Sequence, residues 1–207
     1  MKLNPVNIFN DWAKTGKDEG MAKAHEPSVL EILQYIYKLY DTPYSFLDAG
    51  CGNGWVVRKV ASQKNCTKAI GIDGAKKMIE KAKLKDPSGS YFCTDLMNWE
   101  PQKKVDIVHS MEVIYYFQDP EKIIKHMVKN WINSGGLLIA GMDHYIGNPK
   151  SYSWSNDLNV HMALMSGNEW KNIFSNAGLK NCEFWETQGN DNSPGTLVVS
   201  GRLPRIN

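Results

Sequence analysis

The segment spanning residues 44–54 constrains the fold more than any other part of this chain. Its apolar start, with Phe46 and Leu47, predicts a buried parallel strand, and three glycines follow at alternate positions from Gly50. Glycine is needed where the backbone turns tightly with a positive φ, or where a ligand comes close to the main chain. A helical pattern follows at once. This order of strand, glycine turn and helix predicts a nucleotide-type site at the carboxyl end of a parallel sheet.

The glycine spacing disfavours a dinucleotide. A dinucleotide fingerprint has the pattern G-x-G-x-x-G, with the pyrophosphate on the helix amino terminus. Here the third glycine, Gly54, comes one residue early, and Trp55 occupies the place of the fingerprint glycine. A bulky residue there obstructs close helix–strand packing and the approach of a pyrophosphate. The sequence therefore predicts a nucleoside ligand without a diphosphate, and a nucleotide-dependent oxidoreductase is disfavoured.

Strand and helix patterns alternate through most of the chain, which predicts an α/β fold with a parallel sheet covered on both faces. After the first strand, four more are expected at residues 69–73, 91–95, 105–109 and 137–140, with intervening helices. A helix is expected to begin at Pro27 and Ser28, after an irregular or briefly helical lead-in over residues 1–26. A long loop is expected over 143–166, then a helix over 167–177. Two final strands, 180–185 and 196–200, are joined by a turn at 188–195.

Composition narrows the function classes. The 207 residues suffice for one substantial domain, so we expect a single domain over 1–207. A net charge of +2 without a basic patch predicts no nucleic-acid partner. The four cysteines lack metal-site spacing, so we expect them to be reduced and expect no metal. The chain has neither a ~20-residue apolar span nor a signal-peptide pattern, which predicts a cytoplasmic protein without membrane contact.

Two acids follow the predicted strands that neighbour the first one. Asp73 ends the second strand, where a carboxylate can accept both ribose hydroxyls of a nucleoside. Asp95 ends the third, where it can accept from an adenine amino group while Leu96 packs on the ring. Each acid taken singly can instead be a solvated or turn residue. Because successive strand ends converge on one crevice, the two acids together favour a nucleoside site.

The ordered motifs resemble class I S-adenosylmethionine-dependent methyltransferases over residues 27–202. The resemblance implies a Rossmann-like, doubly wound, seven-stranded sheet with helices on both faces, strand order 3-2-1-4-5-7-6 and an antiparallel C-terminal hairpin. It implies S-adenosyl-L-methionine as the cofactor and a small-molecule substrate, in a monomer or homodimer. The motifs that carry it are Leu47-Asp-Ala-Gly-Cys-Gly-Asn-Gly54, Gly71-Ile-Asp73, Thr94-Asp95, Val105-Asp-Ile-Val-His-Ser-Met-Glu112, Asp119-Pro120 and Gly135-Gly-Leu-Leu-Ile139.

The resemblance also assigns cofactor contacts. The glycine turn would line the methionine part of the cofactor, Asp73 would bind the ribose and Asp95 the adenine. His109 and Ser110 would form the edge at the fourth strand. The cofactor-binding residues implied are Asp48, Gly50, Cys51, Gly52, Asp73, Gly74, Asp95, Leu96, His109 and Ser110.

Two departures bear on the acceptor. DNA amino-methyltransferases of this superfamily carry Asn/Asp-Pro-Pro-Tyr/Phe after strand four, whereas this chain has His109-Ser-Met-Glu112. Small-molecule relatives often place a histidine where Tyr115 and Tyr116 stand, so that histidine cannot be carried over. We predict transfer to a nitrogen, oxygen or sulfur nucleophile of a small molecule. A protein or RNA substrate and a non-catalytic S-adenosylmethionine-binding module stay open as alternatives.

A base is needed if the acceptor arrives protonated. The candidates are His144, His25 and Glu112, with Asp143 as a fourth, and each can instead be structural or solvated. The lead-in and residues 143–166 are predicted to form a lid over the substrate, although their aromatic residues can also merely cover the ends of the sheet. The residues predicted to contact the substrate are Trp12, Tyr115, Tyr116, Tyr152 and Trp154.

Overall fold

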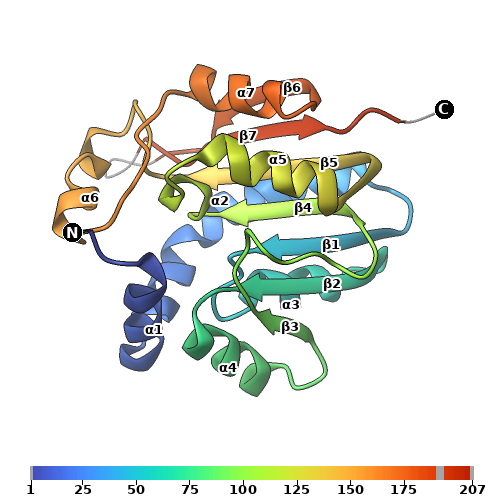
Figure 1. Cartoon of the computed structure of the whole chain (residues 1–207). Helices are drawn as coiled ribbons and strands as arrows, with labels where there is room; N and C mark the ends of the chain where they lie inside the picture. The colour runs from blue at the N-terminus through green and yellow to red at the C-terminus, as the bar shows by residue number, and fades with distance from the viewer. Residues whose placement is uncertain (1, 190–193, 206–207) are drawn as a thin grey trace.

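Seven strands form one sheet in the computed structural model, which describes residues 2–189 and 194–205 (Figure 1). Their order is β3-β2-β1-β4-β5-β7-β6. The first five strands are parallel, and β7 is antiparallel to both β5 and β6. The predicted sheet and its C-terminal hairpin are confirmed. The strands are β1 (Tyr44–Ala49), β2 (Cys66–Asp73), β3 (Ser90–Cys93), β4 (Val105–Met111), β5 (Ile132–Met142), β6 (Lys180–Glu186) and β7 (Leu197–Arg202).

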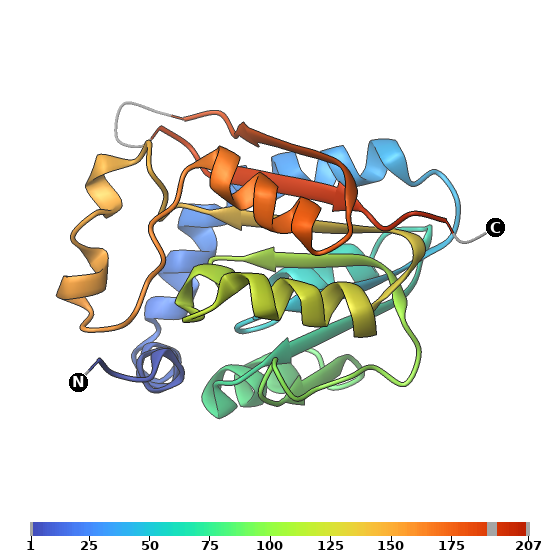
Figure 2. The same ribbon diagram turned by 45° about the horizontal axis from the view of Figure 1, so that its top comes forward.

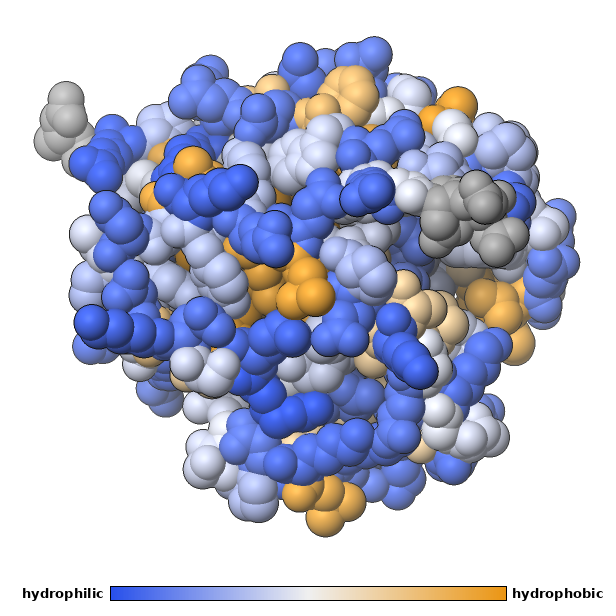
Figure 3. Space-filling view, turned by 180° about the vertical axis from the view of Figure 1, so that it is seen from behind, coloured by the Kyte–Doolittle hydropathy of each residue, from blue (hydrophilic) through white to orange (hydrophobic). Residues whose placement is uncertain are grey.

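Helices cover both faces of the sheet, as Figures 1 and 2 show. Alternate residues of a strand point to opposite faces, so Leu47 joins a core under α5 and α7, whereas Phe46 joins a core under α2 and α3. Seen from behind, the surface is mostly hydrophilic and its apolar residues form small separate patches (Figure 3). The longer helices are α1 (Pro5–Thr15), α2 (Lys17–Leu39), α3 (Trp55–Ala61), α4 (Lys76–Lys85), α5 (Pro120–Asn130) and α7 (Gly167–Asn176).

The predicted start of a helix at Pro27 is wrong. Helix α2 begins at Lys17 and continues through Pro27, and α1 precedes it. Gly16, at φ +78°, ends α1 and joins it to α2. The first turns of α2 bury Asp18 but no apolar side chain, because the apolar face that packs on the sheet begins only at Val29. Periodicity therefore could not reveal this part of the helix.

Four strands and the long loop differ from expectation. Strand β3 ends at Cys93, before the predicted 95, and β4 continues to Met111, beyond the predicted 109. Strands β2 and β5 begin before the predicted 69–73 and 137–140. The first residues of β2 are half-buried or exposed, and in β5 buried Ile132 is followed by polar residues and glycines, so neither start carries an apolar pattern. Residues 143–166 contain a 3-10 helix, η2 (Pro149–Ser151), and a short helix, α6 (Trp154–Asp157). The predicted turn at 188–195 falls partly on 190–193, which lie outside the described residues.

The carboxyl ends of the parallel strands are covered by α1, the start of α2 and α6 (Figure 1). The lead-in and α6 are joined directly, since Leu3 forms a parallel bridge with Val160 and the Lys2 ammonium donates to the Ser155 carbonyl at 2.7 Å. Within the described part of the chain, none of the helices combines the length and apolar composition needed to cross a bilayer.

Candidate active site

The glycine turn after β1 leaves main chain open to a ligand. Gly50, Gly52 and Gly54 all have positive φ, at +79°, +52° and +76°. A Cβ added at Gly50 would lie 2.2 Å from a methyl of Val113, so that position tolerates no side chain. A Cβ at Gly52 would meet, among the described residues, only the Met78 sulfur at 4.0 Å. The space in front of Gly52 is therefore free for a bound molecule.

Asp73, at the end of β2, holds the glycine turn against the start of α4. Its carboxylate accepts hydrogen bonds from the backbone N–H of Gly52 at 2.9 Å and of Ala75 at 2.7 Å. Burial raises the pKa of Asp73 to about 6, although both hydrogen bonds act in the opposite direction. Its position beside the turn is the one expected for a ribose-binding acid.

The described residues enclose two neighbouring cavities at this edge of the sheet, of about 390 and 560 Å³. Phe9, Gly50, Asp73, Val113 and Tyr116 line both, so the two form one continuous site. Eight of the ten residues predicted to bind the cofactor line it. The first cavity contains Asp48, Gly50, Cys51, Gly52 and Asp73, and the second contains Gly50, Asp73, Gly74, Asp95 and Leu96.

His109 and Ser110 are placed elsewhere, contrary to prediction. His109 is fully buried, with Nδ1 2.7 Å from the Asp48 carboxylate, and the Ser110 hydroxyl donates to the Ala49 carbonyl at 2.9 Å. Both residues tie β4 to β1 instead of lining a cavity. The reason is that β4 runs on to Met111, so the strand edge facing the cavity is formed by Met111 and the residues after it.

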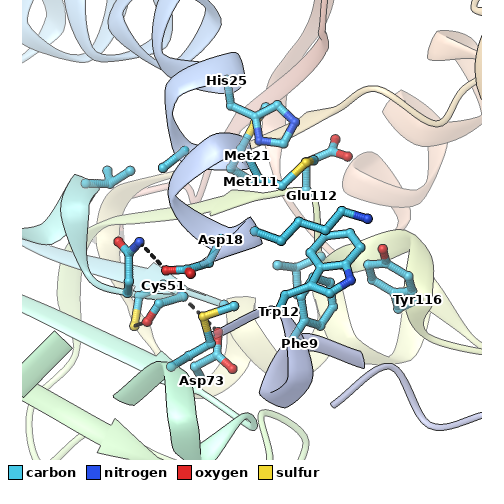
Figure 4. A pocket seen from close by; sticks show the side chains of 18 of the residues that line it. Phe9, Trp12, Asp18, Met21, His25, Cys51, Asp73, Met111, Glu112 and Tyr116 are labelled. Atoms are coloured by element: carbon cyan, nitrogen blue, oxygen red, sulfur yellow. Dashed lines mark hydrogen bonds between the residues drawn. The ribbon is translucent and has the colours of Figure 1, made fainter. Parts of the chain in front are cut away.

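His25 and Glu112 lie at the other end of the first cavity (Figure 4), and with Asp143 they form a cluster of two acids and one histidine. His25 comes from α2, Glu112 follows β4 and Asp143 follows β5. The His25 Nε2 atom is 3.5 Å from an Asp143 carboxylate oxygen, and side-chain N or O atoms of all three residues lie within 4.8 Å of one another. Two of the predicted bases, His25 and Glu112, are thus brought together although they are far apart in the sequence.

Glu112 is fixed in place from both sides. One of its carboxylate oxygens accepts from the backbone N–H of Asp143, and the other accepts from the Tyr115 hydroxyl at 2.7 Å. Its backbone has φ +61°, an uncommon conformation for a residue with a side chain. Backbone strain of this kind gathers at functional sites, where the surrounding structure holds it.

The charges of the cluster depend on one another. Burial and the neighbouring charge of Asp143 raise the pKa of Glu112 to about 7, while His25 acts in the opposite direction. Burial lowers the pKa of His25, but the hydrogen bond to Asp143 and the charge of Glu112 outweigh it, so the net pKa is raised. The cluster can therefore hold or release a proton close to neutral pH.

These pKa shifts predict a pH-dependent effect of Glu112→Gln on stability. Between the usual glutamate pKa of about 4.3 and about 7, the folded chain keeps a proton that the unfolded chain has lost. Stability therefore falls as pH rises through this window, and glutamine avoids that loss. At pH 8 we expect the variant to unfold with a free energy ~1 kcal/mol higher than that of the unchanged protein. For a chain of this length, this corresponds to a Tm higher by about 2–4 °C. A gain that is equal at pH 5 and pH 8 would contradict this expectation; thermal scans at both values measure it.

His144, the third predicted base, does not line either cavity. It is buried, its Nδ1 is 3.0 Å from the Ser151 carbonyl oxygen, and burial lowers its pKa. Its ring lies against Tyr115 and Trp154, with centroids 5.6 and 6.3 Å away. His144 thus supports two residues of the cavity wall from behind.

Aromatic side chains also line the first cavity. Four of the five predicted substrate contacts line the first cavity: Trp12, Tyr115, Tyr116 and Trp154. The fifth, Tyr152, is 44% exposed and lies outside both cavities. Sequence reasoning missed Phe9, which packs edge-on against both Trp12 and Tyr116.

The amino-terminal helices are held to the glycine turn and to α4 by polar contacts. Buried Asp18 accepts from the Asn53 amide at 2.7 Å and from the Lys81 ammonium at 2.8 Å. The Asn10 side chain accepts from the backbone N–H of Lys77 in the first turn of α4. Helices α1 and α2 are therefore part of the site.

Asp18→Ala is expected to lower the free energy of unfolding by about 1–3 kcal/mol, because Asn53 and Lys81 lose a buried acceptor. Glu19→Ala serves as the matched control, since Glu19 pairs with Lys81 and Lys85 at the surface, where such pairs contribute ~1 kcal/mol or less. Urea unfolding of both variants measures the difference. Equal losses would show that Asp18 acts as an ordinary surface acid.

Comparison with known proteins identifies the family. The family described as "Methyltransferase domain" matches residues 21–183. Trans-aconitate 2-methyltransferase of Agrobacterium fabrum is 26% identical over 136 residues, which are 64% of this chain and 49% of that protein. Malonyl-[acyl-carrier protein] O-methyltransferase 1 of Ilyobacter polytropus is 27% identical over 58% of this chain and 44% of that protein. The chain thus spans about half the length of these curated relatives.

Solved structures share the fold. A putative methyltransferase of Haloferax volcanii, solved in complex with the methyltransferase activator Trm112, has a TM-score of 0.82 at 22% identity, covering 95% of this chain and 98% of that one. The N-methyltransferase NodS of Bradyrhizobium japonicum, solved with S-adenosyl-L-homocysteine, has a TM-score of 0.62 at 23% identity, covering 79% and 80%. Together with the strand order and the glycine turn, the family match shows that this chain belongs to the class I S-adenosylmethionine-dependent methyltransferases.

Proposed function

We propose that this protein transfers a methyl group from S-adenosylmethionine to a nitrogen, oxygen or sulfur nucleophile of a small molecule. The observation that carries the proposal is that one cavity is lined both by the open glycine turn and by the side chains of His25 and Glu112. A nucleoside-type site and groups able to move a proton therefore face the same cavity. A non-catalytic binding module would have no need of the second feature.

The residues that line the site fit the cofactor in the order expected along it. Main chain at Gly52 is open to the methionine part, and Asp73, which lines both cavities, can accept from the ribose hydroxyls. Asp95 and Leu96 line the second cavity, where they suit the amino group and the ring of adenine. We therefore assign the methionine part to the first cavity and the adenine to the second.

When bound, S-adenosylmethionine would supply a sulfonium methyl group, whose carbon a nucleophile attacks in line with the neutral thioether as the leaving group. The protein's contribution is to align that nucleophile and to exclude water. Aromatic residues of α1 and α6 cover the cavity, and Glu112 or His25 can accept a proton that the nucleophile must lose. We propose α1, the start of α2 and α6 as the cover of the substrate site.

Isothermal titration tests the proposal at its first step. S-adenosylhomocysteine is expected to bind one site per chain. When a suitable small acceptor is added, the protein is expected to convert S-adenosylmethionine to S-adenosylhomocysteine. No binding of either compound at millimolar concentration would contradict the proposal. Turnover only with a protein or RNA would replace the small-molecule acceptor by a macromolecular one.

A further inference from the structure

The acceptor end of the first cavity is rich in negative charge. Glu112 lies at this end, Asp157 also lines the cavity, and an Asp143 carboxylate oxygen is 3.5 Å from the His25 Nε2 atom. Among the described residues that line this cavity, Lys17 is the one permanently charged cation, and its ammonium lies 4.0 Å from the centre of the Trp12 ring. A carboxylate acceptor would face these acids without an arginine fork to bind it.

The walls of this end of the cavity suit a cation. The rings of Tyr116 and Trp154 line the cavity as well, and the faces of aromatic rings attract positive charge through their quadrupole, whereas the Trp12 ring already holds the Lys17 ammonium. This attraction is stronger where water is excluded. The acidic side chains and the aromatic rings therefore both favour a positively charged ligand.

Glu112 has capacity left for a ligand. An ionised carboxylate has about four lone-pair sites. Two are used by the backbone N–H of Asp143 and the hydroxyl of Tyr115, and both donors fix the direction of the carboxylate. A ligand ammonium entering the cavity can donate to a remaining site, since Glu112 is among the lining residues.

We propose that the acceptor is a primary or secondary amine whose ammonium group binds the Glu112 carboxylate between the aromatic walls and gives its proton to the cluster of His25, Glu112 and Asp143. The inference rests on the proposed methyl transfer and names its substrate class. It differs from what the names of the trans-aconitate and malonyl relatives suggest, because those acceptors carry carboxylates.

The residues of the site can accept the proton that the ammonium group must lose before methyl transfer. An ammonium nitrogen has no lone pair, so one proton first passes from nitrogen to the Glu112 carboxylate. The N–C bond then forms as the C–S bond breaks, and the electron pair of that bond stays on sulfur. The positive charge moves from sulfur to the methylated nitrogen, and the proton on Glu112 leaves through His25 and Asp143 or to water.

The experiment measures binding to the complex of the full chain with S-adenosylhomocysteine. The probes are matched pairs that differ in charge, such as 2-phenylethylamine against 3-phenylpropanoate and tryptamine against indole-3-propanoate. We expect the amines to bind at least tenfold more tightly than their acids. Glu112→Gln is expected to weaken amine binding at least tenfold and to leave S-adenosylhomocysteine binding within twofold. The control Glu80→Gln, at a half-exposed position on α4 outside both cavities, changes neither.

Each result decides the question. Tighter binding of the acids, or no amine binding at millimolar concentration while S-adenosylhomocysteine still binds, overturns the amine assignment but not the methyl-transfer function. Stoichiometric binding of Mn²⁺ that Glu112→Gln removes, with amine binding unaffected, makes the cluster a metal site and also overturns it. Failure of S-adenosylhomocysteine itself to bind contradicts the underlying function instead.

Discussion

Gly52→Val is expected to abolish measurable binding of S-adenosylhomocysteine. The valine side chain would occupy the open space in front of the turn, since a Cβ added at this position would point into that space, 4.0 Å from the Met78 sulfur. The ligand would then meet a β-branched side chain where the structure leaves bare main chain. We expect affinity to fall more than 100-fold, as measured by isothermal titration.

The control must separate this block from backbone strain, because a β-branched residue is disfavoured at φ +52°. Gly178 also has a positive φ, of +97°, and a Cβ there would meet no described atom within 4 Å. Gly178→Val should therefore lose stability through strain while keeping its affinity. Retained affinity in Gly52→Val would show that the ligand does not approach this part of the turn.

Asp73→Ala is expected to weaken S-adenosylhomocysteine binding at least tenfold. Hydrogen bonds to a charged group contribute about 1.5–3 kcal/mol, and a loss of 1.4 kcal/mol is a factor of ten in affinity. The carboxylate also holds Gly52 and Ala75, so its removal loosens the turn that faces the ligand. Titration at pH 8, above the pKa of about 6, measures the effect of the ionised form.

Asp119→Ala provides the matched control for this change. Asp119 is also an acid at the start of a helix, where it accepts from the backbone N–H of Lys122 at the start of α5. Its loss should cost about 1 kcal/mol of stability, as for other helix caps, with affinity unchanged. Equal affinities for both variants would remove Asp73 from the proposed cofactor site.

The sequence was most informative where chemistry depends on residues close together in the chain. The glycine turn carries its own conformational requirement, because three positive φ values within five residues need glycine. The order of strands and helices follows from apolar periodicity. Asp73 ends β2 as predicted, whereas Asp95 lies two residues beyond β3, which ends at Cys93. Eight of the ten expected cofactor residues consequently line the site.

Prediction failed where strand ends or helix starts carry no apolar signal. The fourth strand was predicted to end at residue 109, but β4 continues to Met111. His109 and Ser110 are therefore buried within the strand, where their side chains bind β1. In α2, a polar amino-terminal half hid the helix that brings His25 to the site. Burial patterns reveal packing against a core, and they reveal little about side chains that face a cavity.

The sequence by itself determined the alternation of strands and helices, the glycine turn and a nucleoside-type ligand, since each rests on local periodicity, on residue spacing or on the freedom of glycine. The strand order and S-adenosylmethionine followed from the family resemblance that these motifs carry. Only the tertiary structure decided which of the candidate bases share a site. His25, Glu112 and Asp143 come from α2 and from the ends of β4 and β5, and they meet because β4 and β5 are neighbours under α2. Such contacts arise from long-range packing, and no local pattern in the chain encodes the distance between them.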